Sequence, residues 1–251
     1  MSARRRIAER VIADGLVVAA VAGWWISSRH LPEFVMPSPL SVARTVLDLF
    51  ITPALLADTA ISTARVVVAV VVATMLGGAL AFLPYRWPVA DAIVHDRIKP
   101  FLNSFPSTGW AILAMVWFGT TNFAVVLVEV AILTPFCLVN ISEGLKELDR
   151  ELLEMSGSFT RSRRRVLLKI VVPMLLPYAM SAIRISYGIA WKIALVAELF
   201  GAESGLGFVM LESEIVSDAA TVYATCFAIV LLFLAGEKLV LDPLSRVVAY
   251  K

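Results

Sequence analysis

Long apolar runs, separated by short polar segments, dominate the chain. A helix needs about 20 mostly apolar residues, each rising about 1.5 Å, to cross the hydrocarbon core of a bilayer. Six segments approach this length, and we expect each of them to form one membrane-spanning helix. These segments are residues 11–28, 66–85, 99–119, 123–140, 170–200 and 219–236.

The third segment is irregular, because its first half contains Pro100 and Pro106 together with several polar residues. Proline removes a helical hydrogen bond, and broken backbone at membrane depth is tolerated where it is buried in protein or lines a water-filled cavity. We therefore expect a broken helix, in which Asn103, Ser104 and Ser107 line a translocation pathway. A kinked packing helix, whose backbone is satisfied by these side chains, is the alternative.

Composition supports a membrane protein. Hydrophobic residues make up 59% of the 251 residues and charged residues 17%, and the mean hydropathy is +0.84. An average soluble domain is about 45–50% apolar and about 25% charged. A soluble domain of this composition would expose large apolar patches, and a disordered chain would need far lower hydrophobicity. We find no repeat or flexible linker, and expect a single domain over residues 1–251.

The distribution of charge predicts the orientation, because cytoplasmic loops are enriched in Lys and Arg. The N-terminus, the loops at 86–99 and 146–169 and the C-terminal tail together hold 17 of the 22 basic residues. The opposite side holds only Arg29, Arg44 and Arg65. We therefore expect an all-α membrane protein with six spans and with both termini in the cytoplasm.

Several kinds of chemistry are absent from the sequence. Cys137 and Cys226 form no CxxC pair, and both histidines lie outside the spans. We therefore expect no metal site, and a membrane-embedded hydrolase with an HExxH motif is a rival that the histidine-free spans do not favour. The chain also has no GxxxxGK[ST] phosphate-binding loop, so any ATP that drives its function must bind to another polypeptide.

The longest cytoplasmic loop, residues 142–169, carries an amphipathic pattern. Its large apolar residues recur every three or four positions, which places them on one face of a helix. They are Leu145, Leu148, Leu152, Met155 and Phe159. This spacing is typical both of a helix that packs on its own membrane domain and of a helix that docks into a groove of another protein.

Three longer stretches resemble one protein family. They are ELLEMS (151–156), VLLKIVVPMLLPYAMSAIRISYGIAW (166–191) and VAELFGAESGLGFVM (196–210). With MPSPL after the first span and Trp117-Phe118-Gly119 at the end of the third, they resemble the permease subunits of binding-protein-dependent ABC importers. The resemblance is closest to the nitrate, sulfonate and taurine branch, and it extends from about Leu31 to the C-terminus.

The resemblance implies a cytoplasmic coupling helix that docks on an ATPase subunit, which favours docking for the 142–169 loop. The family's Glu-Ala-Ala motif falls on Glu154-Met155-Ser156, and its glycine position falls on Thr160, where threonine resists a positive φ. The expected ATPase-docking residues are Leu148, Leu152, Glu154, Met155, Ser156, Phe159 and Thr160.

The resemblance also implies partners and a location. A second permease copy would complete a homodimer, two cytoplasmic subunits would bind ATP and Mg, and a solute-binding protein would dock outside the membrane. The chain itself would be a non-catalytic subunit in the cell inner membrane, carrying a small anionic or organic solute.

Ionisable residues inside spans are expensive, and each needs an explanation. Glu129, Arg184, Lys192 and Glu198 are of this kind. We expect Arg184 to serve helix packing. For Lys192 two interpretations stay open: it pairs with Glu129 across helices, or it lines the pathway and attracts an anion. Glu129 and Glu198 are included among the candidate pathway residues.

An ion-gradient-driven secondary transporter is the alternative function. Such a protein would show repeated halves with discontinuous helices at corresponding positions. Only the third span looks broken here.

Overall fold

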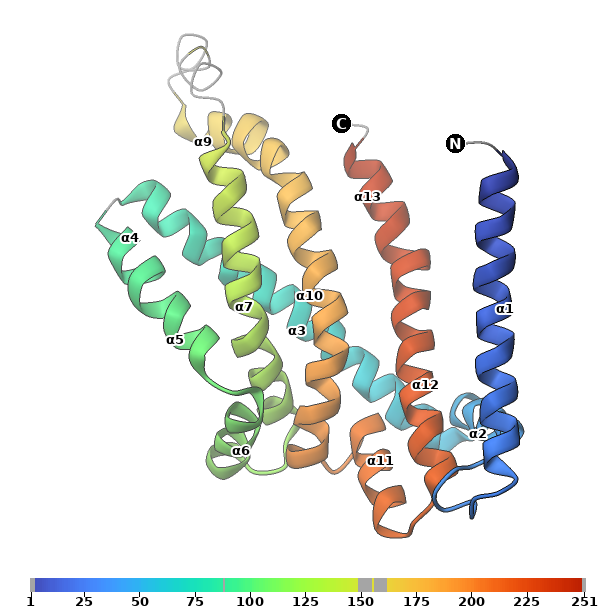
Figure 1. Ribbon diagram of the computed structural model, residues 1–251. Coiled ribbons are helices and arrows are strands. Elements are labelled where there is room, and N and C mark those ends of the chain that lie inside the picture. The colour runs from blue at the N-terminus through green and yellow to red at the C-terminus, as the bar shows by residue number, and fades with distance from the viewer. Residues whose placement is uncertain (1–2, 88, 149–154, 156–161, 250–251) are drawn as a thin grey trace. The chain divides into compact units, whose positions relative to one another are not determined.

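The computed structural model describes residues 3–87, 89–148, 155 and 162–249, and every regular element within these ranges is a helix (Figure 1). Short π-helical segments, labelled η, continue three of the α-helices. This confirms the all-α prediction. The elements are α1 (Ala3–Ser28), α2 (Pro39–Ile51), α3 (Pro53–Arg86), α4 (Ala90–Ile93), η1 (Val94–Ile98), α5 (Lys99–Ser104), α6 (Ser107–Phe118), α7 (Asn122–Lys146), α9 (Arg163–Val166), η2 (Leu167–Val171), α10 (Val172–Gly201), α11 (Leu206–Ile215), α12 (Ala219–Gly236), η3 (Glu237–Leu241) and α13 (Asp242–Ala249).

Long apolar helices occupy the predicted span positions. Four are long and apolar enough to cross a membrane: Pro53–Pro84, Asn122–Lys146, Arg164–Gly201 and Ala219–Arg246. Two shorter apolar helices, Ile12–Ser28 and Ser107–Phe118, occupy the positions of the first and third predicted spans. The second span differs most from its prediction, because α3 begins at Pro53 rather than at residue 66 and so includes Arg65.

The third span is broken, as its prolines predict. Phe105 (φ −84°, ψ 127°) and Pro106 (φ −60°, ψ 140°) are extended and separate α5 from α6. Proline cannot donate the backbone hydrogen bond that would carry one helix into the next. Asn103 and Ser104 are exposed at this break.

Two compact units make up the described chain, and the first combines Met1–Thr59 with Val209–Ala228. In this unit the Ser38 side chain caps α2 by accepting the Ser41 N–H at 3.1 Å, and Pro39 begins the helix. Val42 and Leu49 bury one face of α2. The indole N–H of Trp24 donates to the Pro37 carbonyl at 3.0 Å and fixes the chain that leads into this helix.

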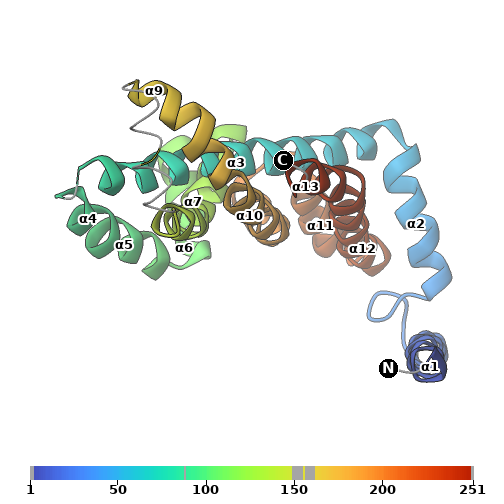
Figure 2. The same cartoon turned by 90° about the horizontal axis from the view of Figure 1, so that it is seen from above.

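The second unit, Ala60–Phe208 with Ile229–Lys251, holds the main helical core. Within it α7 and α10 lie side by side and run antiparallel, and α6 packs against both (Figures 1 and 2). At one point of this contact, the Cys137 Sγ atom of α7 lies 3.1 Å from the Ser186 Oγ atom of α10. Small apolar residues fill the α6–α7–α10 core, among them Ala111, Ala114, Ala124 and Ala197.

A row of small residues brings α3 against α7. Ala73, Gly77 and Ala81 are spaced by four, and the two alanines are buried. A Cβ atom on Gly77 would lie 2.6 Å from the Cys137 Cβ and 2.7 Å from the Leu138 nitrogen. Only glycine allows this approach, as in other rows of small residues that let two membrane helices pack closely.

Candidate functional site

A buried ion pair links α3 to α10 in the second unit. The Arg65 Nη1 atom lies 2.7 Å from the Glu198 Oε1 atom, and the two side chains are 5% and 1% exposed. Removing two charges from water carries a desolvation penalty that Coulomb attraction offsets only when further hydrogen bonds satisfy both groups. The surroundings of both side chains therefore decide whether this pair is stable.

The Arg65 guanidinium is satisfied from two sides. Its Nε and Nη2 atoms donate to the Asn122 Oδ1 atom at the start of α7, at 2.9 and 2.5 Å. Its Nη1 and Nη2 atoms donate to the carbonyl and the hydroxyl of Ser204, at 2.8 and 2.9 Å. A planar guanidinium suits this arrangement, because its donors point outward in a fixed fork.

The Glu198 carboxylate is satisfied by α3 and by the first turn of α11. The Ser62 hydroxyl lies 2.8 Å from both carboxylate oxygens, and it accepts the Leu206 N–H at 2.8 Å. The Gly207 N–H donates to the Glu198 Oε2 atom at 2.9 Å. A carboxylate at this position also complements the free N–H groups at a helix N-terminus. We call Ser62, Arg65, Asn122, Glu198, Ser204, Leu206 and Gly207 the anchor network.

This network was not predicted from the sequence, because Arg65 was expected outside the second span and Glu198 in the pathway. One signal could have found it. In the predicted topology the second span begins, and the fifth span ends, on the external side. A basic residue at the start of the second span and an acidic residue at the end of the fifth span are therefore expected at the same depth in the membrane.

Glu129 lies two helical turns beyond Asn122 on the same face of α7. It is completely buried, and neither carboxylate oxygen has a hydrogen-bond partner among the described residues. The pairing of Glu129 with Lys192, one of the two interpretations of Lys192, is therefore not present in this chain. Its proposed role in the pathway stays a prediction.

Replacing Glu129 by methionine should stabilise the protein by about 1–3 kcal/mol, because the change removes two buried oxygens without partners and keeps the side-chain length. The free energy of unfolding in detergent measures this. Glu129→Ala is the matched control and should be less stable than Glu129→Met, since it leaves a cavity. A destabilised Glu129→Met protein would instead reveal a partner for the carboxylate.

Lys192 lies on the exposed face of α10. Ala190 and Ala194, two residues before and after it, are buried. Two residues turn a helix by about 200°, so Lys192 points away from the face that packs on the neighbouring helices. Ser181 and Ile185 are exposed on the same side as Lys192. Arg184, in contrast, bonds to Asp242 and lies 3.6 Å from Glu237, as expected for a packing role.

The predicted docking loop is described only in part. Leu152, Glu154, Ser156, Phe159 and Thr160 lie outside the residues that the structure describes. Leu148 is 7% exposed and packs within this chain, whereas Met155 has a helical backbone and is 54% exposed. Among the described members of the apolar stripe, Leu145 and Leu148 are therefore buried and Met155 is exposed, and the docking role stays a prediction.

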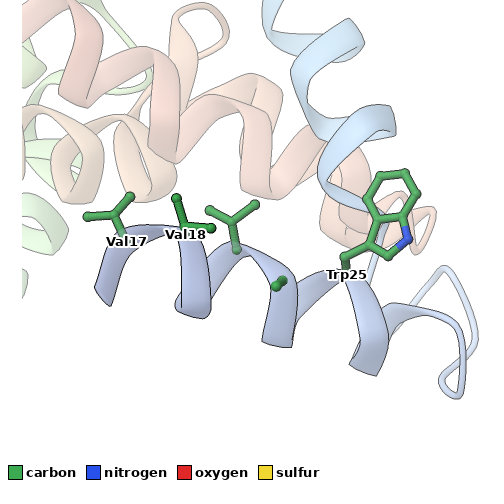
Figure 3. A pocket seen from close by; sticks show the side chains of 5 residues that line it. Val17, Val18 and Trp25 are labelled. Atoms are coloured by element: carbon green, nitrogen blue, oxygen red, sulfur yellow. The ribbon is translucent and has the colours of Figure 1, made fainter. Parts of the chain in front are cut away.

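Surface hollows elsewhere on the described chain include polar and apolar ones, and Glu33, Ser41 and Asp218 line one of the polar hollows. No cluster of potential metal ligands occurs among the described residues. One surface hollow lies on α1 and is lined by Val17, Val18, Val21, Ala22 and Trp25 (Figure 3). All five residues are apolar and belong to one predicted span, so lipid chains suit this hollow better than a polar solute.

Comparison with known proteins agrees with these features. Residues 73–241 match the family described as "Binding-protein-dependent transport system inner membrane component". The formylaminopyrimidine transport permease ThiX of Halalkalibacterium halodurans is 30% identical over 224 residues, covering 85% of each chain. The putative aliphatic sulfonates transport permease SsuC of Escherichia coli is 28% identical over 230 residues, covering 86% of this chain and 84% of its own.

A solved structure shares the fold. A chain of the MetNI methionine ABC transporter in an inward-facing conformation superposes with a TM-score of 0.61 at 18% identity, covering 78% of this chain and 96% of that one. Together with the sulfonate relative, the family match confirms the predicted resemblance, and no match supports an ion-gradient-driven transporter. Since the family match spans more than half of the residues, the chain belongs to the inner membrane components of binding-protein-dependent transport systems and is a non-catalytic permease subunit of an ABC importer.

Proposed function

We propose that two copies of this chain enclose a pathway through the cell inner membrane, and that the exposed face of α10 lines it. The observation that carries this proposal is Lys192, a cation inside a span with no buried neighbour on its own side of the helix. A charge at the centre of a lipid-facing helix costs at least about 2.5–3.5 kcal/mol. This face is therefore sheltered from lipid by water or by a second copy.

A homodimer is the simplest assembly. Symmetric pairs are the commonest oligomers of identical chains, and a twofold axis beside α10 would bring both lysines to one pathway. Asn103, Ser104 and Ser107 would add polar groups from the break between α5 and α6. Glu129 and Glu198, which are buried in this chain, would act behind the pathway wall rather than in it.

Energy would come from partner subunits. The sequence has no phosphate-binding loop, so ATP and Mg would be held by two cytoplasmic ATPase subunits. These subunits would dock on the 142–169 loop, and an external solute-binding protein would deliver the solute. The names of the two relatives give formylaminopyrimidine and aliphatic sulfonates as their solutes. Both are small organic molecules, and sulfonates are anionic.

Lys192→Met should assemble with the ATPase subunits but lower sulfonate uptake about tenfold or more, because the pathway loses the cation that attracts an anion in a medium of low dielectric. The assay is uptake of a radiolabelled alkanesulfonate into proteoliposomes that hold the permease, its ATPase and its binding protein. Lys192→Arg, which keeps the charge, is the matched control.

Uptake of the sulfonate at the unaltered rate by Lys192→Met would contradict the pathway role of this residue. Failure of the unaltered complex to hydrolyse ATP in response to its binding protein would contradict the proposed function as a whole.

A further inference from the structure

The segment between α10 and α11 is bonded to two helices and to a turn. Residues 202–207, which we call the 202–207 segment, receive the Arg65 donors at Ser204 and donate from Leu206 and Gly207 to the side chains of Ser62 and Glu198. At its other edge the Thr120 hydroxyl donates to the Glu203 Oε1 atom at 2.5 Å. Thr120 lies in the turn between α6 and α7, so α3, α10 and the α6–α7 turn all hold this short segment.

Two glycines let the 202–207 segment close directly on Glu198. Gly205 has a φ of +105°, and a Cβ atom there would lie 2.5 Å from the Glu198 Oε1 atom. A Cβ atom on Gly207 would lie 2.6 Å from the Glu198 Cβ and 2.8 Å from the Leu195 carbonyl oxygen. The backbone therefore approaches the carboxylate as closely as its atoms allow, with no side chain between them.

Detaching the 202–207 segment from the anchor network would carry a large free-energy cost. Glu198 would lose its backbone donor Gly207, and Arg65 would lose both partners on Ser204. Unsatisfied buried groups cost more than a satisfied hydrogen bond contributes, and the asymmetry is greatest for charged groups. The number and burial of these bonds favour a permanent attachment over one that breaks in every transport cycle.

We propose that Arg65 and Glu198 are positioning residues that keep the 202–207 segment attached to α3, α7 and α10 through the whole transport cycle. These elements then move as one body, and the segment is not a lid that opens the pathway. This goes beyond the proposed function, which requires a pathway but does not say which of its parts move.

A reversible cross-link tests the proposal. Thr120→Cys with Glu203→Cys places two thiols at an exposed contact outside the buried pair, in a Cys226→Ala protein that retains the buried Cys137. Because a cysteine is shorter than the glutamate that it replaces, a bis-methanethiosulfonate reagent with a two-carbon spacer, which reduction removes, should bridge the two thiols in the assembled complex. Uptake by the cross-linked complex should then stay within about twofold of the reduced complex, because a bond inside one rigid body restrains no necessary motion.

The two single-cysteine proteins, treated with the same reagent, are the matched controls. Loss of uptake on cross-linking of the double variant alone, with recovery on reduction, would overturn the proposal, because it would show that the segment must leave the α6–α7 turn. Failure of the reagent to bridge the two thiols would also overturn it, since the contact would not persist. The unaltered complex supplies the baseline rate, so failure of the proposed function would be seen separately in that sample.

Discussion

Glu198→Gln should lower the free energy of unfolding by about 3–5 kcal/mol, the usual effect of removing one partner from a buried ion pair. Glutamine has nearly the same shape, so the change tests charge rather than packing. It leaves the Arg65 guanidinium 5% exposed with no anion beside it, although Asn122 and Ser204 still accept its donors. The measurement is reversible unfolding of the detergent-purified protein.

Two matched variants separate the ion pair from other effects. Glu203→Gln removes an exposed carboxylate from the same segment and should change stability by no more than about 0.5–1 kcal/mol. Arg65→Met combined with Glu198→Leu should recover part of the loss, because no buried charge then lacks a partner. If Glu198→Gln were as stable as the unaltered protein, the pair would contribute nothing to the fold.

The helices were predictable because the bilayer constrains them strongly. A spanning segment must satisfy its own backbone and be apolar over about 20 residues, which leaves a clear pattern in the sequence. The residue range 219–236 was predicted with the same limits that α12 has. The break at Phe105 and Pro106 was predictable because two prolines occur there together with several polar residues, whereas the single Pro135 lies inside the continuous helix α7.

The anchor network was not predictable from the same pattern. An apolar run ends at its first charge, so the second span was predicted to begin at Val66, directly after Arg65. In the structure α3 continues through Arg65 for another three turns, because Glu198 and Asn122 satisfy the guanidinium. Those partners are 133 and 57 residues away in sequence. No local pattern contains such information.

Helix rotation explains the two other differences. Spacing shows which residues share a face, but not which face the neighbouring helices cover. Lys192 could therefore be assigned either to Glu129 or to the pathway, until the burial of Ala190 and Ala194 placed it on the uncovered side of α10. The same limit applies to the apolar stripe of the cytoplasmic loop. Its spacing places Leu148 and Met155 on one face but could not show that Leu148 is buried and Met155 is exposed.

Because Leu148 is buried and Met155 is exposed, substitutions at these two positions distinguish an effect on folding from an effect on docking. A charge at Leu148 would have to be buried within the permease itself, so Leu148→Asp should destabilise the isolated chain. A charge at Met155 enters an exposed position and should leave the isolated chain unchanged. In the complex, under the proposed docking, the same charge would have to be desolvated against the ATPase, which costs several kcal/mol unless it is paired.

Met155→Asp should therefore abolish the association with the ATPase subunit, weakening it about a hundredfold or more for a penalty of about 3 kcal/mol. Met155→Leu, which keeps an apolar side chain of similar volume, is the matched control and should bind nearly normally. The measurement is recovery of the ATPase on affinity-tagged permease, together with the thermal unfolding of each permease alone. Docking through Met155 requires that the aspartate variant unfold at the normal temperature and recover no ATPase. Full recovery of the ATPase by this variant would place the docking surface elsewhere in the loop, because a buried apolar contact does not tolerate an unpaired carboxylate.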